Sequence, residues 1–189
     1  MNPNDNLICR VMDLELKLIE QEKRIKNLEE FQPLDPLHDR LLVKRLHTDA
    51  IVPRRARRDD AGLDLFACWK RDGLIHPDEW WIYSHSQCTI GTGIALAIPA
   101  GFEGQVRPRS GLAKQYEITL TNSPGTIDAG FTGEILLIVR NLSYTPFKIT
   151  YGMKIAQLVI ARVANLPIDL VDSLPTSDRG EHGFGSTGK

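Results

Sequence analysis

The chain has 189 residues, with 23 Lys and Arg against 24 Asp and Glu, and a formal net charge of -1. This balance excludes a polybasic nucleic-acid-binding protein and an acidic tail, because either would show an excess of one sign. A composition of 42% hydrophobic and 25% charged residues is typical of one globular domain with an appendage. There is no apolar run of about 18 residues and no signal-peptide pattern at the N-terminus, so we expect a soluble intracellular protein that does not enter a membrane.

Residues 1–32 predict an amphipathic helix. The stretch 6–30 contains no Gly or Pro, and seam positions recur at alternating steps of three and four: Val11, Leu14, Leu18, Gln21, Ile25 and Leu28. Such a seam is typical of a coiled coil and favours parallel self-association. Leu16 and Ile19 lie off the seam and favour the alternative, a helix packed on its own domain. Both interpretations stay open, and residues 33–39, with two prolines, follow as a linker.

Residues 40–172 predict an all-β domain. Short runs rich in Ile, Val, Thr and Leu, separated by Gly or Pro signals, occupy residues 41–43, 63–67, 89–98, 118–120, 135–139, 148–150 and 155–163. No helical segment long enough to cover a parallel sheet lies between them, which favours a sandwich, jelly roll or barrel. The segment 68–87 contains three tryptophans and predicts an enlarged loop or extra hairpin, whose aromatic side chains pack against the domain.

Residues 173–189 predict a flexible glycine-rich tail. Its last residues, GFGSTGK, match the start of a phosphate-loop pattern, but the preceding residues are a polar linker and no helix follows, so we expect no P-loop enzyme. The glycines can still direct backbone N–H groups at a polyanion. Arg179 adds a planar cation suited to a terminal phosphate, and Phe184 adds a ring that can stack on a base.

Other chemical signals are weaker. The three cysteines, Cys9, Cys68 and Cys88, are too widely spaced for a disulfide framework or a zinc site, so we expect free buried thiols. The run RRARR at 54–58 is consistent with steering of a triphosphate, nucleic-acid binding or a nuclear address. Two acidic residues follow it at once, which favours a solvated loop.

Five segments in order carry a resemblance to a known family: AGLDL at 61–65, PRSGLA at 108–113, GTIDAGFTGE at 125–134, YGMKIAQL at 151–158, and the glycine-rich tail. From about residue 41 to the C-terminus the chain resembles the homotrimeric dUTPases. The resemblance implies a dUTPase-like β-clip or jelly-roll barrel that forms a trimer, with active sites at subunit boundaries. It implies attack of water on the α-phosphorus of dUTP, which gives dUMP and pyrophosphate and requires Mg²⁺.

Residue roles follow from the same resemblance. Asp128 corresponds to the carboxylate that orients and deprotonates the attacking water. Gln157 corresponds to a glutamine that contacts the phosphate chain or its water, and Asp64 to an acidic residue that helps to hold the hydrated metal. The remaining matched positions are substrate-binding: Arg109, Ser110 and Gly111 for the phosphates; Asn122, Gly125, Thr126, Ile127 and Phe131 for base and sugar; and Arg179, Phe184, Gly185 and Ser186 in the tail.

Some positions depart from the family pattern. Phe131 stands where a Tyr is usual beneath the deoxyribose, which keeps the ring and removes the hydroxyl. Lys154 stands where Arg is usual. Uracil would be read largely by main-chain groups, which leave cytosine with unpaired donors and acceptors.

Alternatives to a plain dUTPase remain at this stage. One is a dCTP deaminase-type relative, and another is a dUTPase-fold protein with an added regulatory role. A protein partner would engage the N-terminal helix or the 68–87 insertion. We expect no stable nucleic-acid binding, and a cytoplasmic location, or a nuclear one if the source is eukaryotic or viral.

Overall fold

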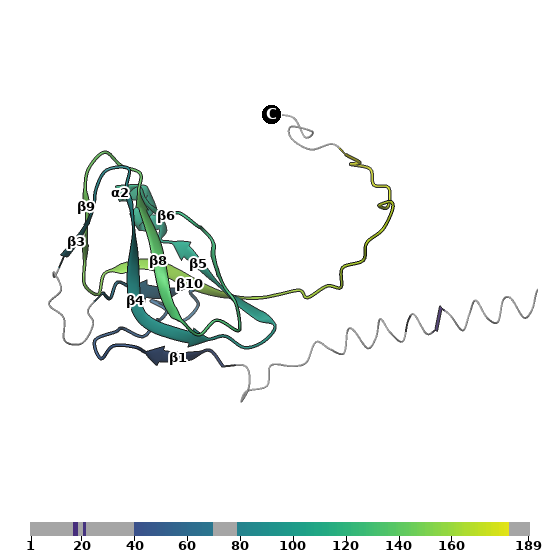
Figure 1. Ribbon diagram of the computed structural model, residues 1–189, viewed down its shortest axis with the longest axis horizontal. Helices are drawn as coiled ribbons and strands as arrows, with labels where there is room; N and C mark the ends of the chain where they lie inside the picture. Colours follow the sequence, from purple (N-terminus) through teal and green to yellow (C-terminus); the bar gives the residue numbers. More distant parts are fainter. Residues whose placement is uncertain (1–16, 19–20, 22–39, 70–78, 182–189) are drawn as a thin grey trace, which may run out of the picture.

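The structure is a computed structural model that describes residues 17, 18, 21, 40–69 and 79–181 (Figure 1). Lys17, Leu18 and Gln21 have helical backbone conformation, and the rest of the predicted N-terminal helix and linker lies outside the described residues. The elements are β1 (Leu42–Arg45), β2 (Leu63–Phe66), β3 (Glu79–Ile82), β4 (Gln87–Ala97), β5 (Phe102–Pro108), α2 (Ser110–Tyr116), β6 (Ile118–Leu120), β7 (Gly125–Ile127), β8 (Glu134–Asn141), β9 (Phe147–Thr150) and β10 (Lys154–Arg162). No helix in the described part of the chain has the length and apolar character needed to cross a membrane.

The strands form two four-stranded sheets and one two-stranded ribbon. The first sheet has the order β1-β4-β8-β6 and the second the order β2-β10-β5-β7, while β3 and β9 form the ribbon. Every pairing between these strands is antiparallel. The expected mostly-β architecture is therefore confirmed, with α2 as a single short helix beside the sheets (Figure 1).

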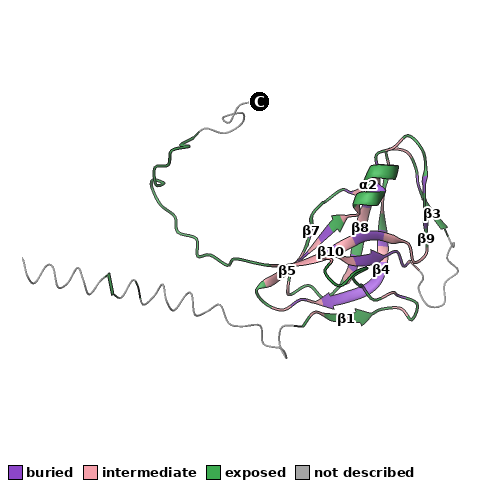
Figure 2. Ribbon diagram, turned by 180° about the vertical axis from the view of Figure 1, so that it is seen from behind, coloured by how far each residue is buried: buried purple, intermediate pink, exposed green. Residues whose placement is uncertain are grey.

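The core lies between the sheets, and β8 shows how the sequence selects it. Ile135, Leu137 and Val139 alternate along this strand and are at most 1% exposed, whereas Leu136 points outward and is 51% exposed. Successive side chains of a strand point to opposite faces, so this two-residue period places one row in the core. Figure 2 shows the buried residues concentrated on the long central strands.

All seven predicted apolar runs overlap a strand, but none of them covers β5 or α2. Along β5, Glu103, Gln105 and Arg107 alternate with small or apolar residues, so the strand has little apolar signal. Gly104 allows close packing there, because a Cβ atom would lie 2.9 Å from Ile98 Cδ1 and 3.0 Å from Leu158 Cδ1. Polar residues on one face and close packing on the other explain why a hydrophobicity pattern does not detect this strand.

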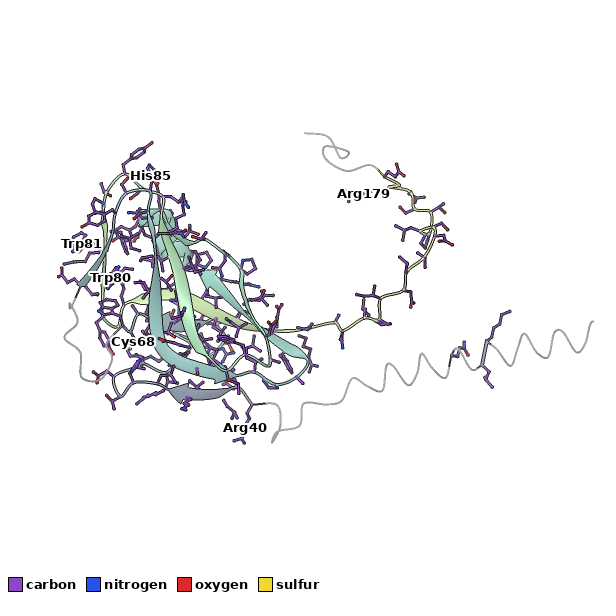
Figure 3. The ribbon with its side chains drawn as sticks, in the orientation of Figure 1. Arg40, Cys68, Trp80, Trp81, His85 and Arg179 are labelled. Atoms are coloured by element: carbon purple, nitrogen blue, oxygen red, sulfur yellow. The ribbon has the colours of Figure 1, made fainter. Side chains whose placement is uncertain are left out.

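For residues 68–87 the sequence predicts an enlarged loop or an extra hairpin, and the described part of this segment contains the strand β3. Within its described residues, β3 pairs with β9, far along the chain, in the register Trp80 to Ile149. Trp69 packs 6.2 Å from Trp80 between ring centroids, as expected for a loop held down by aromatic contacts. Trp80 and Trp81 nevertheless stay 39% and 47% exposed, and Figure 3 shows them on the side of the domain formed by the ribbon.

The described cysteines are free thiols, as predicted. Cys68 is buried and Cys88 is partly buried, and Cys9 lies outside the described residues. Burial raises the pKa of the Cys88 thiol to about 11. Burial, with the neighbouring Cys68, also raises the pKa of Tyr151, whose hydroxyl donates to the carbonyl oxygen of Asp49 at 2.8 Å. Both groups therefore stay protonated at neutral pH.

Beyond β10 the chain leaves the domain as an extended arm. Residues 164–171 have no secondary structure, and Figure 1 shows the arm running away from the sheets. Leu166, Ile168 and Leu170 are 76%, 97% and 102% exposed. The tail beyond residue 181 lies outside the described residues.

Candidate active site

A polar pocket of about 360 Å³ opens beside β2, β10 and the end of β5. Segments far apart in the sequence line it together: Ala56, Asp60, Ala61, Gly62, Asp64, Arg107, Arg109, Ser110, Gly111, Gln157 and Val159. Three of the five sequence segments that carried the resemblance thus meet in one cavity. The antiparallel pairing of β10 with both β2 and β5 brings them together.

Asp64 is the buried charge of this pocket. Its side chain is 12% exposed; Oδ2 lies 2.7 Å from Lys154 Nζ, and Oδ1 lies 3.4 Å from Arg109 Nε. A buried carboxylate is costly unless paired, and two cations lie within ion-pair distance of it here, although Oδ2 accepts no hydrogen bond from the described residues. The backbone also fixes it, because the Asp64 N–H donates to the Arg54 carbonyl oxygen at 2.9 Å.

Arg109 occupies the N-cap position of α2, and its backbone is extended. Its Nη1 donates to the Lys154 carbonyl oxygen at 3.2 Å, so Asp64 and the β10 backbone hold the guanidinium from two sides. The next two residues, Ser110 and Gly111, begin the helix and line the pocket. First-turn N–H groups have no partner inside a helix. The residues predicted to supply a guanidinium, a hydroxyl and a backbone N–H therefore line one cavity.

Gln157 lies on β10 opposite both Asp64 of β2 and Arg107 of β5. Its Nε2 donates to the Pro108 carbonyl oxygen at 3.1 Å. Gly62 allows this position, because a Cβ atom there would overlap Gln157 Oε1. The amide is thus held in the pocket with its carbonyl oxygen against Gly62.

The hairpin around β7 carries the predicted base-binding residues away from this pocket. β7 forms the edge of the second sheet, next to β5, and contains Gly125, Thr126 and Ile127. Asn122 folds back over Gly125, where a Cβ atom would lie 2.9 Å from its amide nitrogen. Phe131 follows in a turn and is 44% exposed.

Asp128 lies at the opposite end of β5 from the pocket. β7 pairs with β5 in the register Ile127 to Gly104, so Asp128 follows at the level of Glu103. Arg109 comes six positions after Glu103, and a strand rises about 3.3 Å per residue, which separates Asp128 from Arg109 by about 20 Å within one chain. Asp128 is exposed there. Within one chain, Asp128 and the polar pocket are therefore far apart.

The tail residues also lie apart from the pocket. Figure 3 shows Arg179 on the extended arm, far from the sheets. Phe184, Gly185 and Ser186 lie outside the described residues.

No protein-only metal centre is present in the part of the chain that the structure describes. That part contains no group of three His, Cys, Asp or Glu side chains able to hold an ion. The pocket offers Asp60 and Asp64, and Asp64 already contacts two cations. Mg²⁺ commonly keeps several waters and binds through one or two carboxylates plus substrate phosphates, and this donor set fits that mode with Asp64 acting through water.

Sequence reasoning missed several residues of the pocket. Arg107 lies on β5, a strand that the hydrophobicity pattern does not predict. It lines the pocket two positions before Arg109. Lys154, which departs from the family pattern, does not line the pocket but contacts its residue Asp64 at 2.7 Å. Asp60 and Ala56 belong to the loop at 54–60, whose charge pattern favours a solvated segment, yet both line the pocket.

Comparisons with known proteins agree with this arrangement. Residues 48–188 match the family model described as dUTPase. A deoxyuridine 5'-triphosphate nucleotidohydrolase of Clostridium kluyveri is 50% identical over 148 residues, which is 78% of this chain and 97% of that protein. One from Syntrophotalea carbinolica is 46% identical over 146 residues, 77% of this chain and 95% of that protein. The solved structure of a Staphylococcus bacteriophage 80alpha dUTPase with dUpNHpp has a TM-score of 0.70 and 26% identity, and covers 80% of this chain and 99% of that chain.

Proposed function

Because the chain belongs to the dUTPase family and is therefore a dUTP nucleotidohydrolase, we propose that it cleaves dUTP at the α-phosphorus to dUMP and pyrophosphate in the presence of Mg²⁺. The observation that carries this proposal is the polar pocket lined by Asp64, Arg109 and Gln157. Cations, a hydroxyl and an amide around one cavity suit a phosphate chain. In the cell, the reaction would limit uracil incorporation into DNA and supply dUMP for dTTP synthesis.

Asp128 would orient a water molecule and accept its proton as the water attacks phosphorus. A carboxylate is a modest base, so positioning and charge neutralisation supply most of the rate in phosphoryl transfer. The bond from the α-phosphorus to the bridging oxygen breaks, and pyrophosphate leaves. Arg109, Ser110 and Gln157 would hold the phosphate chain in line for this step.

Mg²⁺, when bound, would neutralise charge on the phosphate oxygens. Asp64 would contact it only through a water molecule, because Lys154 and Arg109 already lie against both of its oxygens. Arg109 and the Ser110 hydroxyl supply the chain's own contribution to holding the phosphates.

The active unit would be a homotrimer. Since about 20 Å of β5 separates Asp128 from Arg109 in one chain, the water-activating carboxylate and the phosphate pocket must come from different copies. The exposed apolar residues of the arm support the same assembly, because side chains such as Ile168 and Leu170 need another surface to cover them. Arg179, Phe184, Gly185 and Ser186 would close over the bound nucleotide as a lid.

Base and sugar selection would depend on the β7 hairpin. Asn122, Gly125, Thr126 and Ile127 would read uracil largely through backbone groups. The exposed ring of Phe131 would pack beneath the deoxyribose and exclude a 2′-hydroxyl.

Residues 1–32 and 33–39 would form an N-terminal helix and its linker, ahead of a β domain at 40–172 and a lid at 173–189. The helix would reinforce the trimer as a coiled coil, and we propose an intracellular location.

A pyrophosphate-release assay tests the function. The purified chain is compared on dUTP, dCTP, dTTP and UTP, each with Mg²⁺ and with EDTA. We expect turnover of dUTP at least about 100-fold above the others and loss of turnover in EDTA, since a site built to pair with one base leaves groups unpaired with another. Ammonia release from dCTP would instead identify a deaminase and contradict the proposal.

A further inference from the structure

The basic loop, defined here as Arg54 to Asp60, is attached directly to the floor of the phosphate pocket. Arg54 forms an isolated antiparallel bridge with Asp64. Farther along, the Asp60 N–H donates to the Arg57 carbonyl oxygen at 3.2 Å, and the Arg57 N–H donates to Asp60 Oδ2 at 2.8 Å. Ala56 and Asp60 line the pocket itself. The loop is therefore a closed turn at the wall of the site.

This turn restrains the side chain of Arg55 before any ligand binds. Its Nε donates to the Asp60 carbonyl oxygen at 2.7 Å, although the residue is exposed. Among the described residues, no acceptor lies on either of its Nη atoms. An arginine fixed through Nε presents its two Nη groups in one plane, which matches the bidentate geometry that phosphate oxygens accept.

The charges around the pocket leave room for such a contact. Asp60 and Asp64 are its two carboxylates, and Lys154 and Arg109 are already engaged with Asp64. The other arginine of the pocket, Arg107, donates to Gln105 through Nε and Nη2. Arg107 and Arg109 therefore line the pocket with some of their donors already engaged, and the basic loop places a further guanidinium beside it.

We propose that Arg55 binds the distal phosphates of the substrate and the pyrophosphate that leaves. The inference rests on the proposed function for the reaction, and on the geometry of the loop alone for the binding of pyrophosphate. Because the hydrogen bond to the Asp60 carbonyl oxygen already restrains the guanidinium, less side-chain entropy is lost when the anion binds. Arg55 is thus a specificity-determining residue for the length of the phosphate chain.

The test compares Arg55→Gln with a matched control, Arg57→Gln. The control removes the same charge two positions along the chain, and the Arg57 side chain makes no hydrogen bond among the described residues. Affinities for pyrophosphate and dUMP are measured by calorimetry, and KM for dUTP by pyrophosphate release, at physiological ionic strength. We expect Arg55→Gln to weaken pyrophosphate binding and raise KM about tenfold, with dUMP affinity unchanged. Arg57→Gln should change each value less than about twofold.

Three results would overturn the proposal: unchanged pyrophosphate affinity in Arg55→Gln, an equal loss in both variants, or an equal loss for dUMP. An equal loss in both variants would identify diffuse electrostatic attraction. The variant Arg55→Lys further distinguishes a specific contact from diffuse electrostatic attraction. It keeps the charge and loses the planar donors, so a specific contact predicts that most of the roughly tenfold loss remains. Pyrophosphate binding needs no turnover. The difference in pyrophosphate affinity between wild type and Arg55→Gln therefore still tests the role of Arg55 if the chain fails to hydrolyse dUTP.

Discussion

Subunit complementation tests the separation of Asp128 from the phosphate pocket. Two variants, Asp128→Asn and Arg109→Ala, are each expected to be nearly inactive, because one lacks the base and the other a phosphate ligand. Asp128 sits at the level of Glu103 and Arg109 at the far end of β5, so about 20 Å separates them in one chain, while a catalytic contact needs about 3 Å. If both residues act on one substrate as proposed, each working site would combine two copies of the chain.

The expected magnitude follows from counting. In a closed three-fold ring each site takes Asp128 from one copy and Arg109 from its neighbour. When equal amounts of the two variants are unfolded, mixed and refolded, each copy is of the required type with probability one half, so about one quarter of the sites become intact.

The assay is pyrophosphate release from dUTP by the mixture, normalised to wild type refolded in the same way. We expect recovery of about a quarter of the wild-type rate, and none when the folded variants are mixed without unfolding and do not exchange subunits. No recovery after co-refolding, with mixed trimers demonstrated by a tag on one variant, would refute the two-copy site.

Three further changes each test one residue or one segment of the proposed site. Asp128→Asn should lower kcat by about 10³-fold, within the range for loss of a general base, and should leave dUTP affinity within about threefold by calorimetry; normal turnover would remove Asp128 from the mechanism. Gly62→Ala should lower kcat/KM about tenfold, because a Cβ atom that overlaps Gln157 Oε1 displaces the amide, and should add nothing to Gln157→Ala in the double variant; additive losses would contradict this cause. Deletion of residues 178–189 should lower kcat about 100-fold if the tail closes as a lid, and an unchanged single-turnover rate would exclude that role.

The sequence predicted those strands whose energetics depend on a buried face. Ile135, Leu137 and Val139 repeat at the period of a strand and are buried as expected. The polar strand β5 is held instead by hydrogen bonds to β10 and β7 and by the close approach at Gly104. Backbone pairing of this kind depends on partners distant in the sequence, so no local pattern reveals it.

The resemblance predicts the site residue by residue, but it does not predict the charge contacts of the pocket. The contact between Asp64 and Lys154 depends on the register of β10 against β2, which shifts between Lys154 and Ala156. A register shift of this kind re-aims a side chain and has no signature in the spacing of residues. The same limit applied to Asp128, whose distance from the pocket became visible only through the pairing of β7 with β5.

The position of Asp64 also bears on its role. A carboxylate that is 12% exposed, with cations at 2.7 Å and 3.4 Å, acts first on those cations. It holds Arg109 in the pocket before any nucleotide arrives, which lowers the entropy lost on phosphate binding. Removal of the carboxylate alone would leave Lys154 and Arg109 partly buried without their counter-charge. In the proposed reaction, Asp64 would therefore contribute mainly by positioning the Arg109 guanidinium, and a hydrated Mg²⁺ ion would meet an acid that two cations already contact.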